Sequence, residues 1–217
     1  MVSHVVDGHE RKPAIDTGRL VTSIDRFAQI GATAAGGVTR LALSDGDKAA
    51  RDLLAKELTA IGCPVLVDDV GNMRGVFEGK TALGAIQIGS HLDTVIRGGR
   101  FDGALGVLGG LEVLRTIRDR GIQPSRSIEL INWTNEEGAR FEPAMMGSGA
   151  ATGVFDAEWM RDRQDSNGLR LGDELGRLGY AGQQRFRPPV GHAYLELHIE
   201  QGPVLDDADR PVGIVEG

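Results

Sequence analysis

Histidine and carboxylate residues occur in three short clusters of the sequence, and one more histidine follows near its end. The residues are His91, Asp93, Asp102, Glu136, Glu137 and His198. Imidazole nitrogens and carboxylate oxygens together suit zinc, manganese or cobalt better than calcium, which prefers oxygen ligands alone. These residue types therefore indicate a site for divalent transition metals and the hydrolytic chemistry that such ions support.

A two-metal site would give each cluster a task. Asp102 fits a bridging position, because a carboxylate has two oxygens and can bind two ions roughly 3.5 to 4 Å apart. Asp93 follows His91 by two residues and could accept the second ring N–H of that histidine, which would fix its tautomer. In the doublet Glu136-Glu137, one carboxylate can bind metal while its neighbour takes a proton from water.

Each cluster also has a purely structural interpretation. A His-x-Asp sequence by itself is typical of a hydrogen-bonded loop, and an acidic doublet often begins a helix. Asp102 could be a helix N-cap, and His198 could be a hydrogen-bonded residue on a strand. Four such groups, each at the end of an element and separated by regular structure, favour a shared site over four unrelated explanations.

Helical and strand patterns alternate along the chain, which is typical of an α/β fold. Apolar residues recur every three to four positions after Ser44 and again from about Gly103 to Arg120, and both segments are predicted helices. Strands are predicted over residues 65–68, 74–77, 85–89, 127–133 and 193–200. We expect a mostly parallel sheet with helices on both faces, incomplete at the C-terminus.

The polar clusters lie where these elements end or begin. His91 comes just after one predicted strand, Glu136 follows another, and Asp102 precedes the second helix. Alternation over residues 193–200 places His198 on the same strand face as Glu196. Because open α/β sheets bind ligands beyond the carboxyl ends of their strands, the clusters are predicted to converge there.

Composition limits the possible partners and compartments. The 217 residues carry a formal net charge of -7, and basic residues are scattered, which disfavours nucleic acid as a partner. The first residues contain no basic and apolar leader, and no apolar run is long enough to cross a membrane. Cys63 is the single cysteine, so a disulfide framework is excluded. We expect a cytoplasmic protein without a membrane partner.

Five sequence blocks, taken in order and spacing, resemble the M20 metallopeptidase clan, in its branch of N-carbamoyl-L-amino-acid hydrolases and allantoate amidohydrolases. The blocks are Gly89-Ser90-His91-Leu92-Asp93-Thr94, Gly99-Arg100-Phe101-Asp102-Gly103, Asn135-Glu136-Glu137-Gly138-Ala139-Arg140-Phe141, Met146-Gly147-Ser148-Gly149 and His198-Ile199-Glu200-Gln201-Gly202-Pro203. The last block is specific to this branch and favours ureido or carbamoyl substrates over peptides.

The resemblance implies a role for each site residue. His91 and His198 would bind different metal ions, Asp102 would bridge them, and Glu137 would bind one of them. Glu136 would be the general base. It further implies that Gln201 contacts the ureido group of a small carbamoyl or ureido amino acid, which would be the substrate. The implied cofactors are two divalent ions, either zinc or else manganese or cobalt. Members of the branch form homodimers.

The resemblance also implies a domain organisation. Residues 1–16 would be an N-terminal tail, and residues 17–217 the N-terminal portion of the catalytic domain. The lid and dimerisation domain, and the segment that returns to supply a further histidine and a basic residue, are expected to be missing. Two alternatives to a working carbamoyl hydrolase stay open. One is an inactive remnant that binds metal or a partner chain, and the other is an M20 dipeptidase or aminoacylase.

Overall fold

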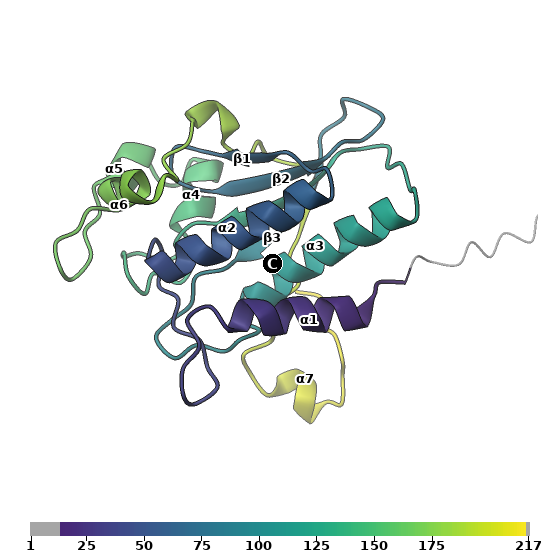
Figure 1. Cartoon of the computed structure of the whole chain (residues 1–217), viewed down its shortest axis with the longest axis horizontal. Helices are drawn as coiled ribbons and strands as arrows, with labels where there is room; N and C mark the ends of the chain where they lie inside the picture. The colour runs from purple at the N-terminus through teal and green to yellow at the C-terminus, as the bar shows by residue number, and fades with distance from the viewer. Residues whose placement is uncertain (1–13, 216–217) are drawn as a thin grey trace, which may run out of the picture.

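Five strands form one mixed sheet in the computed structural model, which describes residues 14–215 (Figure 1). The strands are β1 (Val65–Val67), β2 (Met73–Phe77), β3 (Ile86–His91), β4 (Ile128–Trp133) and β5 (Ala193–Leu195). Their order is β1-β2-β4-β3-β5; β4, β3 and β5 run parallel, whereas β2 is antiparallel to both β1 and β4. The α/β class is confirmed, and the parallel strands are those that lead to the polar clusters.

Connection length explains why the sheet is mixed. Only residues 68–72 separate β1 from β2, which is too short for a crossover, so these strands pair antiparallel. The Asp68 carboxylate stabilises that turn by accepting hydrogen bonds from the backbone N–H of Val70 at 3.0 Å and of Asn72 at 2.8 Å. The connection from β3 to β4 instead contains a long helix, as parallel neighbours require.

Three helices cover one face of the sheet: α1 (Thr17–Ala28), α2 (Asp45–Ala60) and α3 (Ala104–Asp119) (Figure 1). The helices predicted after Ser44 and from about Gly103 to Arg120 are α2 and α3, so both are confirmed. The Ser44 hydroxyl caps α2 by accepting from the Asp47 N–H at 3.2 Å. Helix α2 packs on β1 and β2, and α3 packs on β3 and β4.

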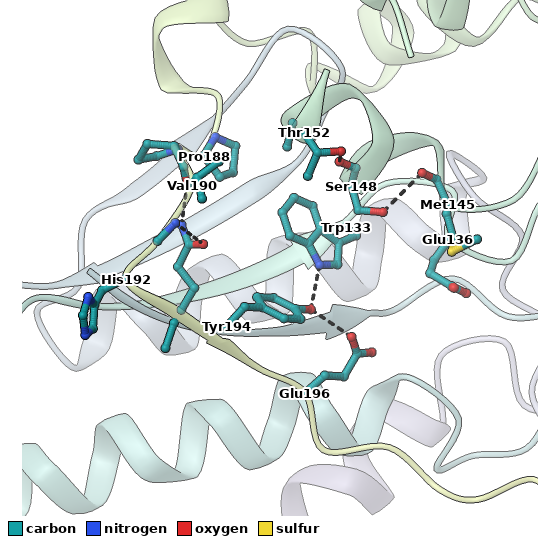
Figure 2. Close-up of a pocket in the computed structure, with 15 residues that line it drawn as sticks. Trp133, Glu136, Met145, Ser148, Thr152, Pro188, Val190, His192, Tyr194 and Glu196 are labelled. Carbon is teal, nitrogen blue, oxygen red and sulfur yellow. Dashed lines mark hydrogen bonds between the residues drawn. The ribbon is translucent and has the colours of Figure 1, made fainter. Parts of the chain in front are cut away.

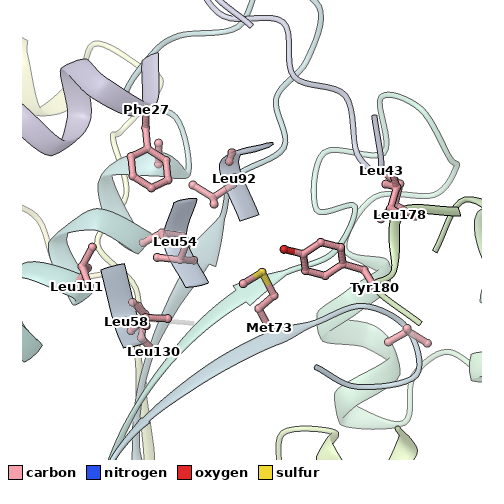
Figure 3. Close-up of a cluster of buried hydrophobic side chains, with 14 of the residues drawn as sticks. Phe27, Leu43, Leu54, Leu58, Met73, Leu92, Leu111, Leu130, Leu178 and Tyr180 are labelled. Carbon is pink, nitrogen blue, oxygen red and sulfur yellow. The ribbon is translucent and has the colours of Figure 1, made fainter. Parts of the chain in front are cut away.

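The core lies between these helices and the sheet (Figure 3). Large apolar side chains with almost no exposed surface fill it, including Phe27, Leu54, Leu58, Leu92, Leu111 and Leu130. Gly110 of α3 permits close packing, because a Cβ there would lie 2.6 Å from the Leu130 side chain. The tight contact holds α3, and with it the loop before α3, against the strands that carry the site.

Smaller helices follow β4: α4 (Met146–Thr152), α5 (Ala157–Arg161), α6 (Leu171–Leu178), the 3₁₀ helix η1 (Gln184–Phe186) and α7 (Val204–Asp207). Helix α4 packs near β4 and lines a cavity on the sheet face opposite α3. Side chains alternate along β4, which explains how Leu130 can face α3 while Trp133 faces α4. Within residues 14–215, no helix is long and apolar enough to span a membrane.

The last predicted strand is shorter in the structure than the sequence pattern indicates. Residues 193–200 alternate in the sequence, but β5 ends at Leu195. Beyond that point a side-chain contact replaces strand pairing, because the Ser90 hydroxyl of β3 donates to the Glu196 carboxylate at 2.7 Å. Most of the tail predicted for residues 1–16 lies outside the described residues.

Candidate metal centre

His91 is the last residue of β3 and its side chain is only 2% exposed. Its Nδ1 lies 2.8 Å from the backbone carbonyl oxygen of Asp93. Since a carbonyl oxygen can only accept, Nδ1 carries the proton and the Nε2 lone pair is left for a ligand. Gly103 makes room for the ring, because its φ is +57° and a Cβ there would lie 2.5 Å from His91 Nε2.

The Asp93 carboxylate has a different partner from the one the sequence predicts. Its Oδ1 is 3.9 Å from His91 Nδ1, too far for a hydrogen bond. The two carboxylate oxygens instead accept from the backbone N–H groups of Glu136 at 3.3 Å and Glu137 at 3.2 Å. Burial is the largest contribution that raises the Asp93 pKa to about 6. Asp93 thus orients His91 through its carbonyl and supports the glutamate doublet through its side chain.

Asp102 and His198 meet beside His91. Asp102 lies in the loop before α3, and its Oδ1 is 3.3 Å from His198 Nε2. The rings of His91 and His198 are stacked, with centroids 5.9 Å apart. One ligand atom from each of the three residues lies within 4.8 Å of the other two. The structure therefore brings together two histidines and a carboxylate from three separate parts of the sequence.

Glu136 and Glu137 reach the same place from the loop after β4. Glu136 Oε2 lies 3.4 Å from His91 Nε2, and its side chain is 31% exposed. Glu137 Oε1 is buried and has no hydrogen-bond partner among the described residues. Burial, opposed by His91 and reinforced by Asp102, raises the Glu137 pKa to about 7. One glutamate is thus open to solvent, and the other has a buried oxygen that lacks a partner.

These residues fit a divalent metal ion. A buried carboxylate oxygen without a partner is costly, and a cation would satisfy it. Four carboxylates, those of Asp93, Asp102, Glu136 and Glu137, surround or adjoin His91 and would repel one another if all were ionised. The free nitrogens and oxygens form the borderline-hard donor set that zinc, manganese and cobalt accept. The arrangement can hold such an ion and keep a carboxylate beside it.

Gln201 stands apart from the group. It lies between β5 and α7 with a φ of +55° and is exposed. Within residues 14–215, its side chain makes no hydrogen bond to the other site residues. Its contact with a ureido group stays a prediction.

A cavity of 560 Å³ borders the centre on the sheet face opposite α3 (Figure 2). Glu136 and Glu196 lie on its lining beside the aromatic rings of Trp133 and Tyr194. Trp133 Nε1 donates to the Tyr194 hydroxyl at 2.9 Å, and that hydroxyl donates to Glu196 at 2.9 Å. Sequence reasoning missed this chain of hydrogen bonds, for which the alternation of Tyr194 and Glu196 along one strand was the only signal.

Comparison with known proteins gives consistent results. Residues 87–215 match the family described as peptidase family M20/M25/M40. N-carbamoyl-L-amino-acid amidohydrolase of Rhizobium meliloti is 44% identical over 93% of this chain, and allantoate amidohydrolase of Bacillus subtilis is 36% identical over 88%. The crystal structure of a hydantoinase/carbamoylase family amidase from Burkholderia multivorans superimposes with a TM-score of 0.89 at 47% identity, over 91% of this chain.

The matches cover only part of each relative. This chain spans 49% of the Rhizobium protein, 47% of the Bacillus protein and 48% of the Burkholderia structure. It therefore spans about half the length of the curated relatives it matches. The order of motifs in the sequence agrees with these similarities. The chain belongs to peptidase family M20/M25/M40, where it groups with the hydantoinase/carbamoylase amidases.

Proposed function

We propose that this chain carries the metal-binding half of an amidohydrolase site that cleaves the carbamoyl C–N bond of N-carbamoyl amino acids or allantoate. The observation that carries the proposal is the convergence of His91, Asp102 and His198 to within 4.8 Å, beside the unpartnered oxygen of Glu137. The names of the relatives supply the substrate class, since they act on carbamoyl or allantoate compounds.

Two divalent ions, either zinc or else manganese or cobalt, fit the donors best in this proposal. His91 and Glu137 would bind one ion, His198 would bind the other, and Asp102 would bridge them. Asp102 suits the bridge because it lies next to His198 and raises the pKa of Glu137, so it adjoins both halves of the site. When bound, such ions lower the pKa of water and polarise a carbonyl group.

The residues of the chain would perform the proton transfers. Glu136 is the proposed general base, because its carboxylate is partly exposed and lies 3.4 Å from His91 Nε2. It would accept a proton from the attacking water and return it to the leaving nitrogen as the tetrahedral intermediate collapses. Asp93 would hold Glu136 in place through the backbone N–H at 3.3 Å. Collapse would release one amine and leave a carbamate, which decomposes without further catalysis, so the products would be ammonia, carbon dioxide and a free amino acid.

The same proposal covers the substrate contact of Gln201, the domain organisation, the assembly and the compartment. Gln201 would contact the ureido group, residues 17–217 would be the N-terminal portion of a catalytic domain, and the working form would be a homodimer in the cytoplasm. A buried, unpaired Cys63 is compatible with a reducing compartment.

Metal content and ammonia release, measured together on the 217-residue chain, test the proposal. The chain would be supplied with zinc, manganese or cobalt and then with a panel of N-carbamoyl amino acids, allantoate, N-acetyl amino acids and dipeptides. Glu136→Gln is the matched control, because it keeps the shape of the side chain and removes the base. We expect ammonia from carbamoyl substrates, and its loss in Glu136→Gln with metal retained.

Other outcomes separate the alternatives. Metal binding with no turnover of any substrate would favour a remnant that binds metal or a partner chain. Cleavage of acyl or peptidyl amino acids, but not of carbamoyl ones, would favour a dipeptidase or aminoacylase. Absence of metal binding would contradict the proposed site itself.

A further inference from the structure

Arg140 is a partly buried cation three residues after Glu137, and the proposed chemistry assigns it no role. Its side chain is 12% exposed. Nε donates to Asp165 at 3.0 Å and one terminal nitrogen donates to Glu174 at 2.8 Å. The other terminal nitrogen donates to the carbonyl oxygens of Ala42 at 3.0 Å and Leu43 at 2.6 Å. Four of the five guanidinium N–H groups thus have partners, which holds the side chain in one position.

Arg140 lies on the carboxylate loop, defined here as residues 134–145, between β4 and α4. The near side of this loop is held to the segment that follows β3, because the Asp93 carboxylate accepts from the N–H groups of Glu136 and Glu137. Inside the loop, the Asn135 side chain donates to the Phe141 carbonyl at 2.7 Å. The loop therefore behaves as a closed ring, and Arg140 attaches its far side to the rest of the protein.

The carboxylates that bind Arg140 come from the α5–α6 segment, defined as residues 157–182. Its two short helices lie side by side at one edge of the molecule (Figure 1). Leu171, Leu175 and Leu178 bury one side of α6 in the core. Glu174 also accepts two hydrogen bonds from Arg177, at 2.8 and 3.0 Å, and these lower its pKa. Burial of Asp165 is outweighed by hydrogen bonds from the Leu169 N–H and from Arg140, which lower its pKa. Both carboxylate acceptors of Arg140 are therefore ionised at neutral pH.

We propose that Arg140 is a positioning residue through which the α5–α6 segment sets the placement of Glu136 and Glu137. The inference rests on the proposed function, because it assumes that Glu137 binds metal and that Glu136 moves a proton. Both tasks depend on placement to a fraction of an ångström. Removing the guanidinium would leave Asp165 and the carbonyls of Ala42 and Leu43 without their hydrogen-bond donor, and would free the far side of the loop.

Two measurements test this role on Arg140→Met, which keeps the aliphatic stem and removes the charge. Asp165→Asn serves as the milder variant if Arg140→Met does not fold. Arg170→Gln is the matched control, because it removes an exposed ion pair with Asp162 in the same segment and leaves Asp165 and Glu174 with their partners. Hydrogen exchange follows the amides of Glu136, Glu137 and Met145 without metal. Cobalt titration, read by the visible absorption bands, follows the metal site.

We expect exchange at these amides to rise roughly ten- to a hundredfold in Arg140→Met, with β3 and β4 unchanged. Cobalt affinity should fall about 10- to 100-fold, with altered absorption bands, as is typical when the residues supporting a metal ligand are lost. Arg170→Gln should match the unmodified chain in both measurements.

Exchange that is unchanged in the loop, or that rises equally in β3 and β4, would overturn the proposal, because Arg140 would then contribute only to overall stability. If the unmodified chain binds no cobalt, the proposed function fails, and the exchange measurement still decides whether Arg140 holds the loop.

Discussion

The two sides of the candidate metal centre differ in how firmly they are held. On the first side, His91 is 2% exposed, its ring is oriented by the Asp93 carbonyl, and Glu137 is attached to the Asp93 carboxylate. On the second side, His198 is 30% exposed and follows a strand of only three residues. Its ring contacts Asp102 and the neighbouring Ile199 carbonyl.

This difference indicates that the two proposed ions bind unequally. Ligands that are already in position lose little conformational freedom on binding, whereas exposed ones must be ordered. The first ion should therefore bind tightly beside His91, and the second more weakly beside His198. Asp102 belongs to both sides, so filling the first should help to position ligands for the second.

The largest expected effect comes from removing the buried histidine. His91→Ala should abolish binding of the tight ion, because it removes the nitrogen donor of the first side and leaves only carboxylate oxygens, which suit zinc less well. Isothermal titration with zinc measures this. His192→Ala, which removes an exposed histidine that lines the neighbouring cavity, is the control. Retention of the tight step in His91→Ala would contradict the comparison.

A smaller loss of metal binding is expected from His198→Ala. It should remove the weak step of the same titration and leave the tight step within about threefold of its original affinity, because His91, Asp102 and Glu137 keep their positions. Loss of both steps would mean that the two histidines bind a single shared ion. The sheet and helices should be unaffected, because the His198 side chain contributes little to the core, and circular dichroism checks this.

Lower pH should weaken metal binding on the first side, because Glu137 becomes protonated. Its pKa of about 7 means that a proton competes with metal, so affinity for the tight ion should fall roughly tenfold per pH unit below pH 7. Zinc titrations between pH 5.5 and 8 measure the slope. An affinity that is flat across this range would contradict the burial of Glu137.

The same groups affect stability without metal. The folded-state pKa values of Glu137 and Asp93, about 7 and about 6, exceed those of unfolded carboxyl groups, so folding favours their protonated forms. Their contribution to stability is thus fully present below about pH 4 and is lost as pH rises toward 7. Calorimetry without metal should show a higher melting temperature at pH 5.5 than at pH 8, and zinc should reduce the difference.

The smallest expected effect concerns the support of the second side. Ser90→Ala removes the hydroxyl that donates to the Glu196 carboxylate at 2.7 Å. Glu196 lies two residues before His198. Loss of one hydrogen bond to a partly solvated carboxylate should weaken the second ion by about fivefold. Ser148→Ala, which removes an exposed hydroxyl bonded to the Met145 carbonyl, should have no effect. An equal effect of both substitutions would show that Glu196 does not position His198.

Local patterns predicted most of the fold and part of the site. Helices α2 and α3 have capping residues and apolar spacing that are visible in the sequence, and His91, Asp102 and Glu136 lie at element ends as predicted. The Asp93 contact was predicted wrongly, because a carboxylate two residues away could reach either the imidazole or the next loop, and only tertiary packing decides. The strand predicted over residues 193–200 was too long, because alternation does not reveal where a partner strand stops pairing.

Arg140 illustrates a further limit of the sequence. The carboxylates that accept from Arg140 lie 25 and 34 residues further along the chain. No periodic pattern links positions so distant. The contact could be recognised only once α6 had been placed beside the carboxylate loop.

The central claim is that the ends of three parallel strands form a two-ion site, and anomalous diffraction from zinc-soaked crystals of this chain tests it most directly. We expect a strong zinc peak beside His91 Nε2 within bonding distance of Asp102 and Glu137, and a weaker peak between Asp102 and His198. No peak at His91, or zinc bound only at other surface residues, would contradict the account.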